Sequence, residues 1–199
     1  MKLALIHSVT ENYQPLVNVC YPNHQDYAAN HNYDCLLKID NERPLFGRFY
    51  YAIDMLKQYD AVAIIDIDLL FSNKQIKLED KLGNYDLVTG RDVNGLNCSI
   101  VIIRNSEWSF KFWENYFSHI WDVSCAEQTT LAYNLCVADK AKWSVVNQQR
   151  ELFSILGQHY DRYDINEEYQ EGDFCLTLPG LSLEKRIEIL SDYKNKLLC

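Results

Sequence analysis

The chain has 199 residues, and 48% of them are hydrophobic, which is enough to build a packed domain without disulfide bonds. We therefore expect a single domain over residues 1–199. Asp and Glu number 28 against 19 Lys and Arg, and the net charge of −9 argues against nucleic acid or an anionic membrane as the main partner.

The cysteines and the apolar runs indicate a cellular compartment. The seven cysteines are scattered, odd in number and never arranged as Cys-x-x-Cys, so we expect reduced thiols. The first apolar run, residues 3–6, is too short for a signal peptide, and no later run reaches membrane-spanning length. The sequence thus predicts a cytoplasmic protein without a membrane span.

The predicted elements alternate over the first third of the chain. Strands are expected at residues 2–9, 33–39 and 60–65, and helices at residues 14–31 and 45–58. This alternation is typical of right-handed crossovers in a parallel sheet, so the fold class is α/β. Later, the pattern predicts strands near residues 86–89, 97–103 and 142–146, and helices near residues 106–119, 126–138 and 183–197. No Gly-x-Gly-x-x-Gly sequence or P-loop follows the first strand, which disfavours a dinucleotide-binding fold or a P-loop NTPase.

Two aspartates, Asp66 and Asp68, follow the uninterrupted apolar run at residues 61–65. A run without polar alternation indicates a central strand buried on both faces, and the C-terminal end of such a strand is where α/β folds bind ligands. In an extended strand the two carboxylates would point the same way, about 6.5 Å apart. Hard oxygen ligands at this spacing suit Mg²⁺ or Mn²⁺. The alternative is an ordinary cap or turn, where Asp is also favoured.

Several segments occur in the order found in a known family. They are Asn30-His31-Asn32-Tyr33-Asp34, residues 59–71, residues 97–109, Glu127-Gln128 and Gly172-Asp173-Phe174. Together they resemble the galactosyl-, mannosyl- and xylosyltransferases of glycosyltransferase family 34, and the compact form is similar to the glycosyltransferase domains encoded by large algal (chlorella) viruses. The resemblance implies a single-domain GT-A fold, with a mostly parallel central sheet flanked by helices and a small mixed C-terminal part.

The resemblance assigns roles to residues near the acidic pair. Asp66-Ile67-Asp68 matches the family's Asp-x-Asp, which holds a divalent ion on the diphosphate of a sugar nucleotide. The edge that receives the nucleotide base matches Val9, Thr10 and Tyr13. Arg48 stands where the family usually has a lysine that approaches the phosphates. A surface tyrosine in a turn and a solvated helix charge are the competing interpretations of Tyr13 and Arg48.

Further site residues follow from the same resemblance. Asn97 and Cys98 match a strand that lines the donor-sugar pocket, with Ser99 in place of a glycine. Glu127-Gln128 matches the family's Asp-Gln near the transferred sugar, although an acid at Glu127 would also suit the first turn of any helix. The remaining donor-site residues that the resemblance implies are Lys38, Gly180 and Lys185, with Arg186 as an alternative to Lys185.

The last matching motif departs from the family pattern. Gly172-Asp173-Phe174 is present and makes Asp173 a second candidate carboxylate beside Glu127. The family then continues to a histidine that binds the metal, but Thr177 stands at that position here. The third protein ligand is therefore open, and His159 is the nearest candidate in sequence.

The resemblance implies transfer of a hexose, with retention of configuration, from a nucleotide-diphosphate sugar to a glycan or glycoprotein acceptor. A UDP-sugar is the expected donor and Mn²⁺ or Mg²⁺ the expected cofactor, with Glu127 or Asp173 supporting an oxocarbenium-like sugar. Two other classes stay open. In a phosphohydrolase of the haloacid-dehalogenase kind, Asp66 would be the nucleophile and Asp68 the acid/base. The other open class is a non-catalytic sugar- or nucleotide-binding module.

Overall fold

The computed structural model describes residues 1–43, 45–92, 95–121, 123, 125–146, 152–155 and 168–197. The predicted alternation at the start of the chain is confirmed. It consists of β1 (Leu3–Val9), the short 3-10 helix η1 (Glu11–Tyr13), α1 (Gln14–His31), β2 (Asp34–Ile39), α2 (Gly47–Leu56) and β3 (Ala61–Ile65). Pro22 lies inside α1 without ending it.

The main sheet has six strands in the order β2-β1-β3-β6-β5-β7. The strands from the later part of the chain are β5 (Leu87–Asp92), β6 (Gly95–Arg104) and β7 (Trp143–Val146). β1 pairs in parallel with β2 and β3, and β5 pairs in parallel with β7, whereas β6 runs antiparallel to both of its neighbours. The sheet is therefore mostly parallel, as the sequence predicts.

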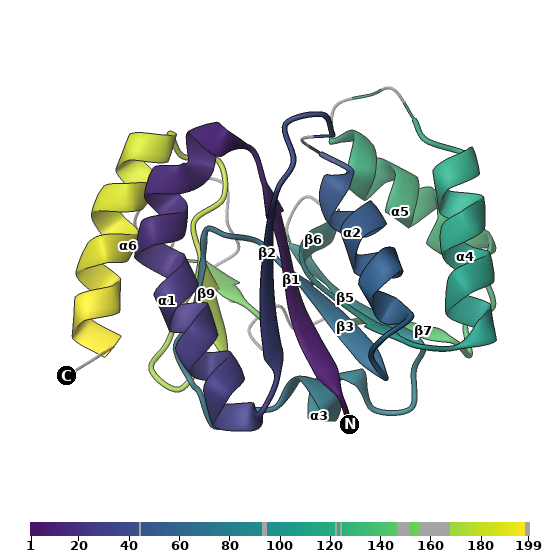
Figure 1. The fold of residues 1–199 in the computed structure, drawn as a ribbon, viewed down its shortest axis with the longest axis horizontal. Helices are drawn as coiled ribbons and strands as arrows, with labels where there is room; N and C mark the ends of the chain where they lie inside the picture. The colour runs from purple at the N-terminus through teal and green to yellow at the C-terminus, as the bar shows by residue number, and fades with distance from the viewer. Residues whose placement is uncertain are drawn as a thin grey trace.

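Helices cover both faces of this sheet (Figure 1). On one face, α2, α4 (Glu107–Ser118) and α5 (Ala126–Val137) pack on alternate residues of β3 such as Val62 and Ile64. On the other face, α1 and α3 (Leu78–Leu82) share a core with Ala61, Ala63 and Ile65. Both sets of β3 side chains are buried, which explains the unbroken apolar run. No helix in the described part of the chain has both the length and the apolarity needed to cross a membrane.

A second, smaller sheet has the order β4-β9-β8. Its strands are β4 (Leu69–Phe71), β9 (Cys175–Thr177) and β8 (Ser154–Ile155). β9 is antiparallel to β4 and parallel to β8, so the sheet is mixed, and α1 and α6 (Leu183–Leu197) lie side by side next to it (Figure 1). This is the small mixed C-terminal part that the family resemblance implies.

The link between the two sheets corrects one prediction about the acidic pair. β3 ends at Ile65, Ile67 and Asp68 form a turn, and the chain then enters β4 of the smaller sheet. The pair is therefore not on a continuing extended strand, and the spacing estimated from strand geometry does not apply. The apolar run Leu69-Leu70-Phe71 does not reveal this change of sheet, because a second buried strand has the same apolar composition.

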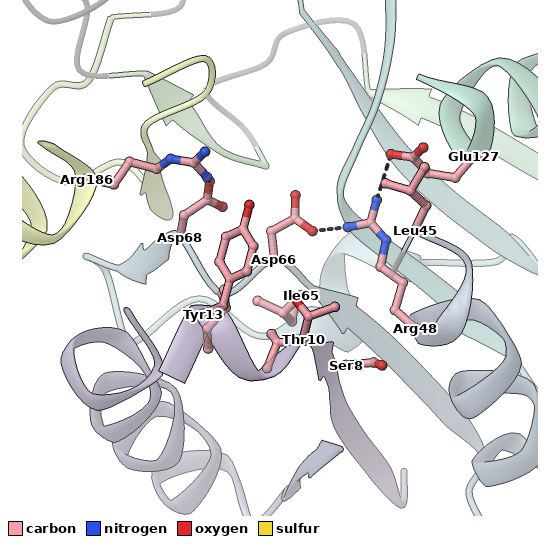
Figure 2. Close-up of a pocket in the computed structure, with 12 residues that line it drawn as sticks. Ser8, Thr10, Tyr13, Leu45, Arg48, Ile65, Asp66, Asp68, Glu127 and Arg186 are labelled. Carbon is pink, nitrogen blue, oxygen red and sulfur yellow. Dashed lines mark hydrogen bonds and ion pairs between the residues drawn. The ribbon is translucent and has the colours of Figure 1, made fainter. Parts of the chain in front are cut away.

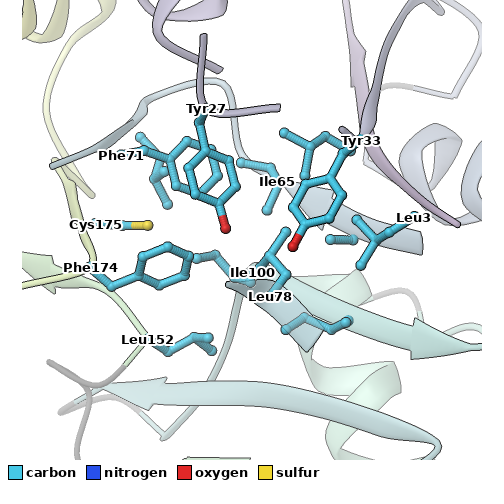
Figure 3. Packing of buried hydrophobic residues seen from close by; sticks show 14 of the residues in the cluster. Leu3, Tyr27, Tyr33, Ile65, Phe71, Leu78, Ile100, Leu152, Phe174 and Cys175 are labelled. Carbon is cyan, nitrogen blue, oxygen red and sulfur yellow. The ribbon is translucent and has the colours of Figure 1, made fainter. Parts of the chain in front are cut away.

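Aromatic side chains fill the space between the two sheets. Tyr27 of α1 stacks on Phe71 of β4 with ring centroids 3.8 Å apart, and Phe174 packs against both rings (Figure 3). The Tyr27 hydroxyl donates to the Ile76 carbonyl at 2.8 Å, so the buried ring keeps a hydrogen bond. The smaller sheet is thus anchored to α1, and with it the turn that carries the acidic pair.

Candidate functional site

A cleft of about 280 Å³ lies where β1 and β3 end (Figure 2). The ends of parallel strands are the expected position for a ligand crevice. The residues that line the cleft are Ser8, Val9, Thr10, Tyr13, Leu45, Arg48, Ile65, Asp66, Ile67, Asp68, Glu127 and Arg186. The fold thereby brings together residues from the N-terminal strand, the 3-10 helix η1, the 66–68 turn and three α-helices, α2, α5 and α6.

Each aspartate of the pair is bound by an arginine from a different side of the cleft (Figure 2). Arg48 of α2 donates through Nη1 to Asp66 Oδ1, and Arg186 of α6 donates through Nη1 to Asp68 Oδ2 at 2.7 Å. Burial raises the pKa of Asp68, and the positive charge of Arg186 opposes that effect. The two guanidinium groups therefore compensate charges that burial would otherwise make costly.

Glu127 stands in the first turn of α5 and approaches the same arginine. Its Oε1 is 3.6 Å from Arg48 Nη2, and its backbone carbonyl accepts a hydrogen bond from the Tyr116 hydroxyl at 3.0 Å. Within the described residues, Glu127 Oε2 and Arg48 Nε are buried and have no hydrogen-bond partner. Buried polar atoms are usually paired, so this acceptor and donor in the cleft wall point to a polar ligand.

The family profile of the galactosyl transferase GMA12/MNN10 family matches residues 58–188, more than half of the chain. The chain belongs to this family. It is therefore a glycosyltransferase, and the resemblance seen in the sequence is confirmed. The matched segment contains the acidic pair, Glu127 and Arg186, but not the first strand or Arg48.

Solved structures of other glycosyltransferases share the fold. A glycosyltransferase involved in the glycosylation of the major capsid of PBCV-1 superposes with a TM-score of 0.74 at 12% identity, over 96% of this chain and 100% of that one. GlyE of Streptococcus pneumoniae TIGR4 superposes with a TM-score of 0.60 at 14% identity, over 100% of this chain and 63% of that one. At these identities the matches support the GT-A fold alone. No curated protein sequence is significantly similar to the chain.

The ligand set suits a hard divalent cation that shares its shell with a substrate. Asp66 and Asp68 both line the cleft with carboxylate oxygens. No cluster of three or more His, Cys, Asp or Glu side chains that could enclose an ion is present among the described residues. Mg²⁺ in particular is commonly held by one or two carboxylates together with phosphate oxygens and water. The family's Asp-x-Asp is thus compatible with an ion that arrives with a diphosphate.

Thr177, which the resemblance aligns with the family's histidine, lies close to the pair but does not line the cleft. It pairs with Leu69 across the smaller sheet, and its hydroxyl donates to the Asp68 main-chain carbonyl at 3.3 Å. The side chain is buried and supports the 66–68 turn. The alternative candidate, His159, falls outside the described residues.

Asn97 and Cys98 lie in β6 and do not reach the cleft lining. The Asn97 side chain donates to Asp92 Oδ2 at 2.7 Å and accepts from the Ser99 amide at 2.7 Å, so it closes the β5–β6 hairpin internally. Cys98 is buried in the core beneath α2, and burial raises the pKa of its thiol to about 12. The structure thus places both residues behind the cleft wall.

Asp173 lies at the other end of β4 from the acidic pair. Its carboxylate accepts from the Ser154 hydroxyl at 2.7 Å and from the Gln170 amide at 2.8 Å. The carbonyl of Phe174, the next residue, accepts hydrogen bonds from the two amides that follow β4. Asp68, in contrast, immediately precedes the start of β4. Asp173 therefore stabilises a turn of the smaller sheet and is not among the residues that line the cleft.

The remaining predicted residues are not among those that line the cleft. Lys38 pairs with Asp40 at 3.1 Å, and Lys185 pairs with Glu188 at 2.9 Å on the exposed side of α6. Gly180 adopts a φ of +76° in the turn before α6, and Gln128 follows Glu127 in α5. The lining residues that the sequence did not single out are Ser8, Leu45 and Ile65. Their positions beside the predicted Val9, Arg48 and Asp66 could have indicated them.

Proposed function

We propose that the chain is a metal-dependent hexosyltransferase that uses a nucleotide-diphosphate sugar, a UDP-sugar in the first instance, and a glycan or glycoprotein acceptor. The observation that carries the proposal is the convergence of the acidic pair, two arginines and Glu127 in one cleft at the strand ends. Retention of configuration is proposed from the family resemblance.

The arginines are suited to bind the diphosphate. A guanidinium group presents a planar fork of N–H donors that matches phosphate oxygens, and Arg48 and Arg186 reach the cleft from opposite sides. A divalent ion bound by Asp66 and Asp68 would supply Lewis-acid stabilisation of the negative charge on the leaving diphosphate. In the structure these same arginines neutralise the aspartates. Tyr13, at the end of η1, offers a ring to the nucleotide base.

We assign Glu127 to the sugar. Its Oε2 has no hydrogen-bond partner within the described residues, so it can accept a hydrogen bond from a sugar hydroxyl. As the bond to the diphosphate breaks, positive charge develops at the anomeric carbon, and a nearby carboxylate stabilises it. Arg48 holds the other oxygen of Glu127 at 3.6 Å and so links the carboxylate to the phosphate side of the cleft.

The test is a panel of UDP- and GDP-sugars incubated with Mn²⁺, with release of the nucleoside diphosphate as the readout. Transferases commonly leak donor to water, so slow metal-dependent release of UDP is expected even without an acceptor. Phosphate released from phosphomonoesters instead would indicate the phosphohydrolase, and binding without turnover would indicate the binding module.

The matching site variants are Asp66→Asn and Asp68→Asn. Each removes one anionic ligand while keeping the shape of the side chain, so we expect turnover to fall at least about 100-fold. Asp60→Asn is the control, because Asp60 precedes the same strand at its other end and accepts from the Lys2 amide at 2.7 Å. Turnover close to wild type in either site variant at excess Mn²⁺ would contradict the assignment.

A further inference from the structure

Two histidines lie directly beneath the 66–68 turn, and neither was singled out by the sequence. His7 is in β1 and His24 is in α1, and both side chains are fully buried. Their rings stack with centroids 4.8 Å apart and planes 21° from parallel. Tyr21 and Phe71 pack edge-on against this pair, so the stack is enclosed by aromatic side chains.

Each ring binds the main chain at one end of the turn. His7 Nδ1 lies 3.0 Å from the carbonyl oxygen of Ile65, the residue before Asp66. His24 Nε2 lies 2.6 Å from the carbonyl oxygen of Leu69, the residue after Asp68. One stacked pair therefore holds both ends of the segment that carries the two carboxylates.

The strand geometry explains why side chains are needed at these two points. The parallel pairing of β1 with β3 ends at Ile6 and Ile64. Beyond that point the carbonyl of Ile65 is bonded by the His7 ring and not by a main-chain amide of β1. β4 pairs with β9 along one edge, and α1 faces the other. There Asn23 bonds both the amide and the carbonyl of Phe71, at 2.8 and 3.1 Å, and His24 takes the carbonyl of Leu69.

The hydrogen bonds also define the protonation state of the rings. A carbonyl oxygen only accepts, so His7 must carry its proton on Nδ1 and His24 on Nε2. Burial lowers the pKa of both rings, that of His24 to about 4, and their hydrogen bonds to the carbonyls oppose this effect only in part. Both imidazoles are thus neutral donors at pH 7, and they add no positive charge beneath a site that would bind a cation.

We propose that His7 and His24 are positioning residues of the donor site, which fix the separation and direction of the Asp66 and Asp68 carboxylates by holding the main chain on both sides of them. This inference rests on the proposed metal-dependent function. Partners that orient metal ligands typically change metal affinity 10–100-fold when they are removed. Because these rings act through the main chain, we expect the lower end of that range.

The test replaces each histidine in turn with asparagine and with glutamine, whose side-chain amides lie at different distances from the main chain. An Asn amide nitrogen occupies the position of Nδ1, and a Gln amide nitrogen occupies that of Nε2. We therefore expect His7→Asn and His24→Gln to bind Mn²⁺ in the presence of UDP within about threefold of wild type, and His7→Gln and His24→Asn to bind about tenfold more weakly. Titration calorimetry of Mn²⁺ into each protein with saturating UDP measures this.

A matched control and a second readout separate positioning from general stability. His31 is on the same helix and also bonds a carbonyl, that of Lys74 at 2.8 Å, but this carbonyl lies away from the turn. His31→Leu should leave Mn²⁺ affinity unchanged. Hydrogen exchange of the ligand-free proteins should show faster exchange at residues 66–69 in His7→Gln and His24→Asn only.

The outcomes are distinguishable. Opposite amide preferences at the two positions support the inference, because a role limited to filling volume would not reverse between them. Equal affinity in all four amide variants, or an equal loss in all four, overturns it while leaving the proposed function intact. If wild-type protein with UDP binds no Mn²⁺, both the metal-dependent function and the positioning role are overturned.

Discussion

Arg48 contacts two of the three carboxylates that line the cleft, Asp66 and Glu127. A lysine would present a single point charge and would serve one of them at a time. The guanidinium fork of Arg48 instead joins the acidic pair to Glu127. Arg48 thus makes Glu127 part of the same charge network.

The role of Glu127 in this charge network can be tested by substitution. We expect Glu127→Gln to lower kcat about 100-fold, about 2.7 kcal/mol, while the Kd for UDP changes less than about threefold, because the proposed function assigns this carboxylate to the sugar and not to the nucleotide. Steady-state kinetics and UDP calorimetry measure the two quantities. Glu184→Gln is the control, since Glu184 is also a first-turn acid but lies at the exposed start of α6. A matching loss of UDP affinity in Glu127→Gln would instead assign the residue to the nucleotide.

Lys185 and Arg186 are adjacent in sequence, and the structure distinguishes them. Arg186 bonds Asp68 in the cleft, whereas Lys185 pairs with Glu188 outside it. We expect Arg186→Gln to weaken UDP binding about tenfold through the lost charge-assisted hydrogen bonds, and Lys185→Gln to leave it unchanged. Calorimetric titration of UDP with Mn²⁺ compares the two proteins. A larger effect at Lys185 would show that α6 presents its other side to the ligand.

At the scale of elements, the 66–68 turn matters because the chain passes there from one sheet to the other. β3 belongs to the main sheet and β4 to the smaller one, so the direction of the acidic pair depends on how the sheets pack. That packing is close where Gly90 of β5 meets Phe153, next to β8. A β-carbon at Gly90 would fall well inside van der Waals contact with the Phe153 ring.

The Gly90 contact gives a stability prediction. We expect Gly90→Ala to lower the free energy of unfolding by about 1–3 kcal/mol, because the buried Phe153 ring must move. In a Phe153→Leu background the same change should cost clearly less, since the ring atoms are gone. Urea denaturation of the four proteins completes the cycle. Strictly additive losses would mean that the two positions do not interact.

At the scale of the whole molecule, buried His24 couples folding to pH. Burial lowers the pKa of its ring from 6.5 to about 4, while the hydrogen bond to the Leu69 carbonyl opposes the shift. The unfolded chain therefore binds a proton below about pH 6.5 that the folded chain does not accept until about pH 4. Stability from the neutral ring is complete above pH 6.5 and is lost as the pH falls toward 4, by about 3 kcal/mol in all.

The corresponding experiment compares wild type with His24→Gln, which keeps a donor to Leu69 but cannot titrate. We expect the free energy of unfolding of wild type to fall more steeply between pH 7 and pH 4.5, by roughly 2–3 kcal/mol. Urea denaturation at both pH values measures the difference. His7 is also buried with a lowered pKa, and because His24 contributes to that lowering, the measured difference includes the coupling between the two rings. Parallel pH dependences would show that His24 titrates normally in the folded state.

The sequence by itself determined the strands and helices of the main sheet. It also determined that the acidic pair follows the C-terminal end of the central strand β3. The alternating β and α segments, the buried strand β3 at the apolar run and the long helix α1 are all present as predicted. These features depend on the local periodicity and composition of short segments, which hold whatever the rest of the chain does. The family motifs added the identity of the fold for the same reason, since each is a short local pattern.

Only the tertiary structure decided which side chains meet in the cleft. Arg186 and Asp68 are 118 residues apart, and their contact depends on α6 packing beside α1 and the smaller sheet. Because of the same packing, Asp173 lies at the end of β4 that is far from the acidic pair, and His7 and His24 lie beneath the 66–68 turn. Such contacts join segments that are remote along the chain, so they are determined by the close packing of two sheets and their helices, and no local pattern records them.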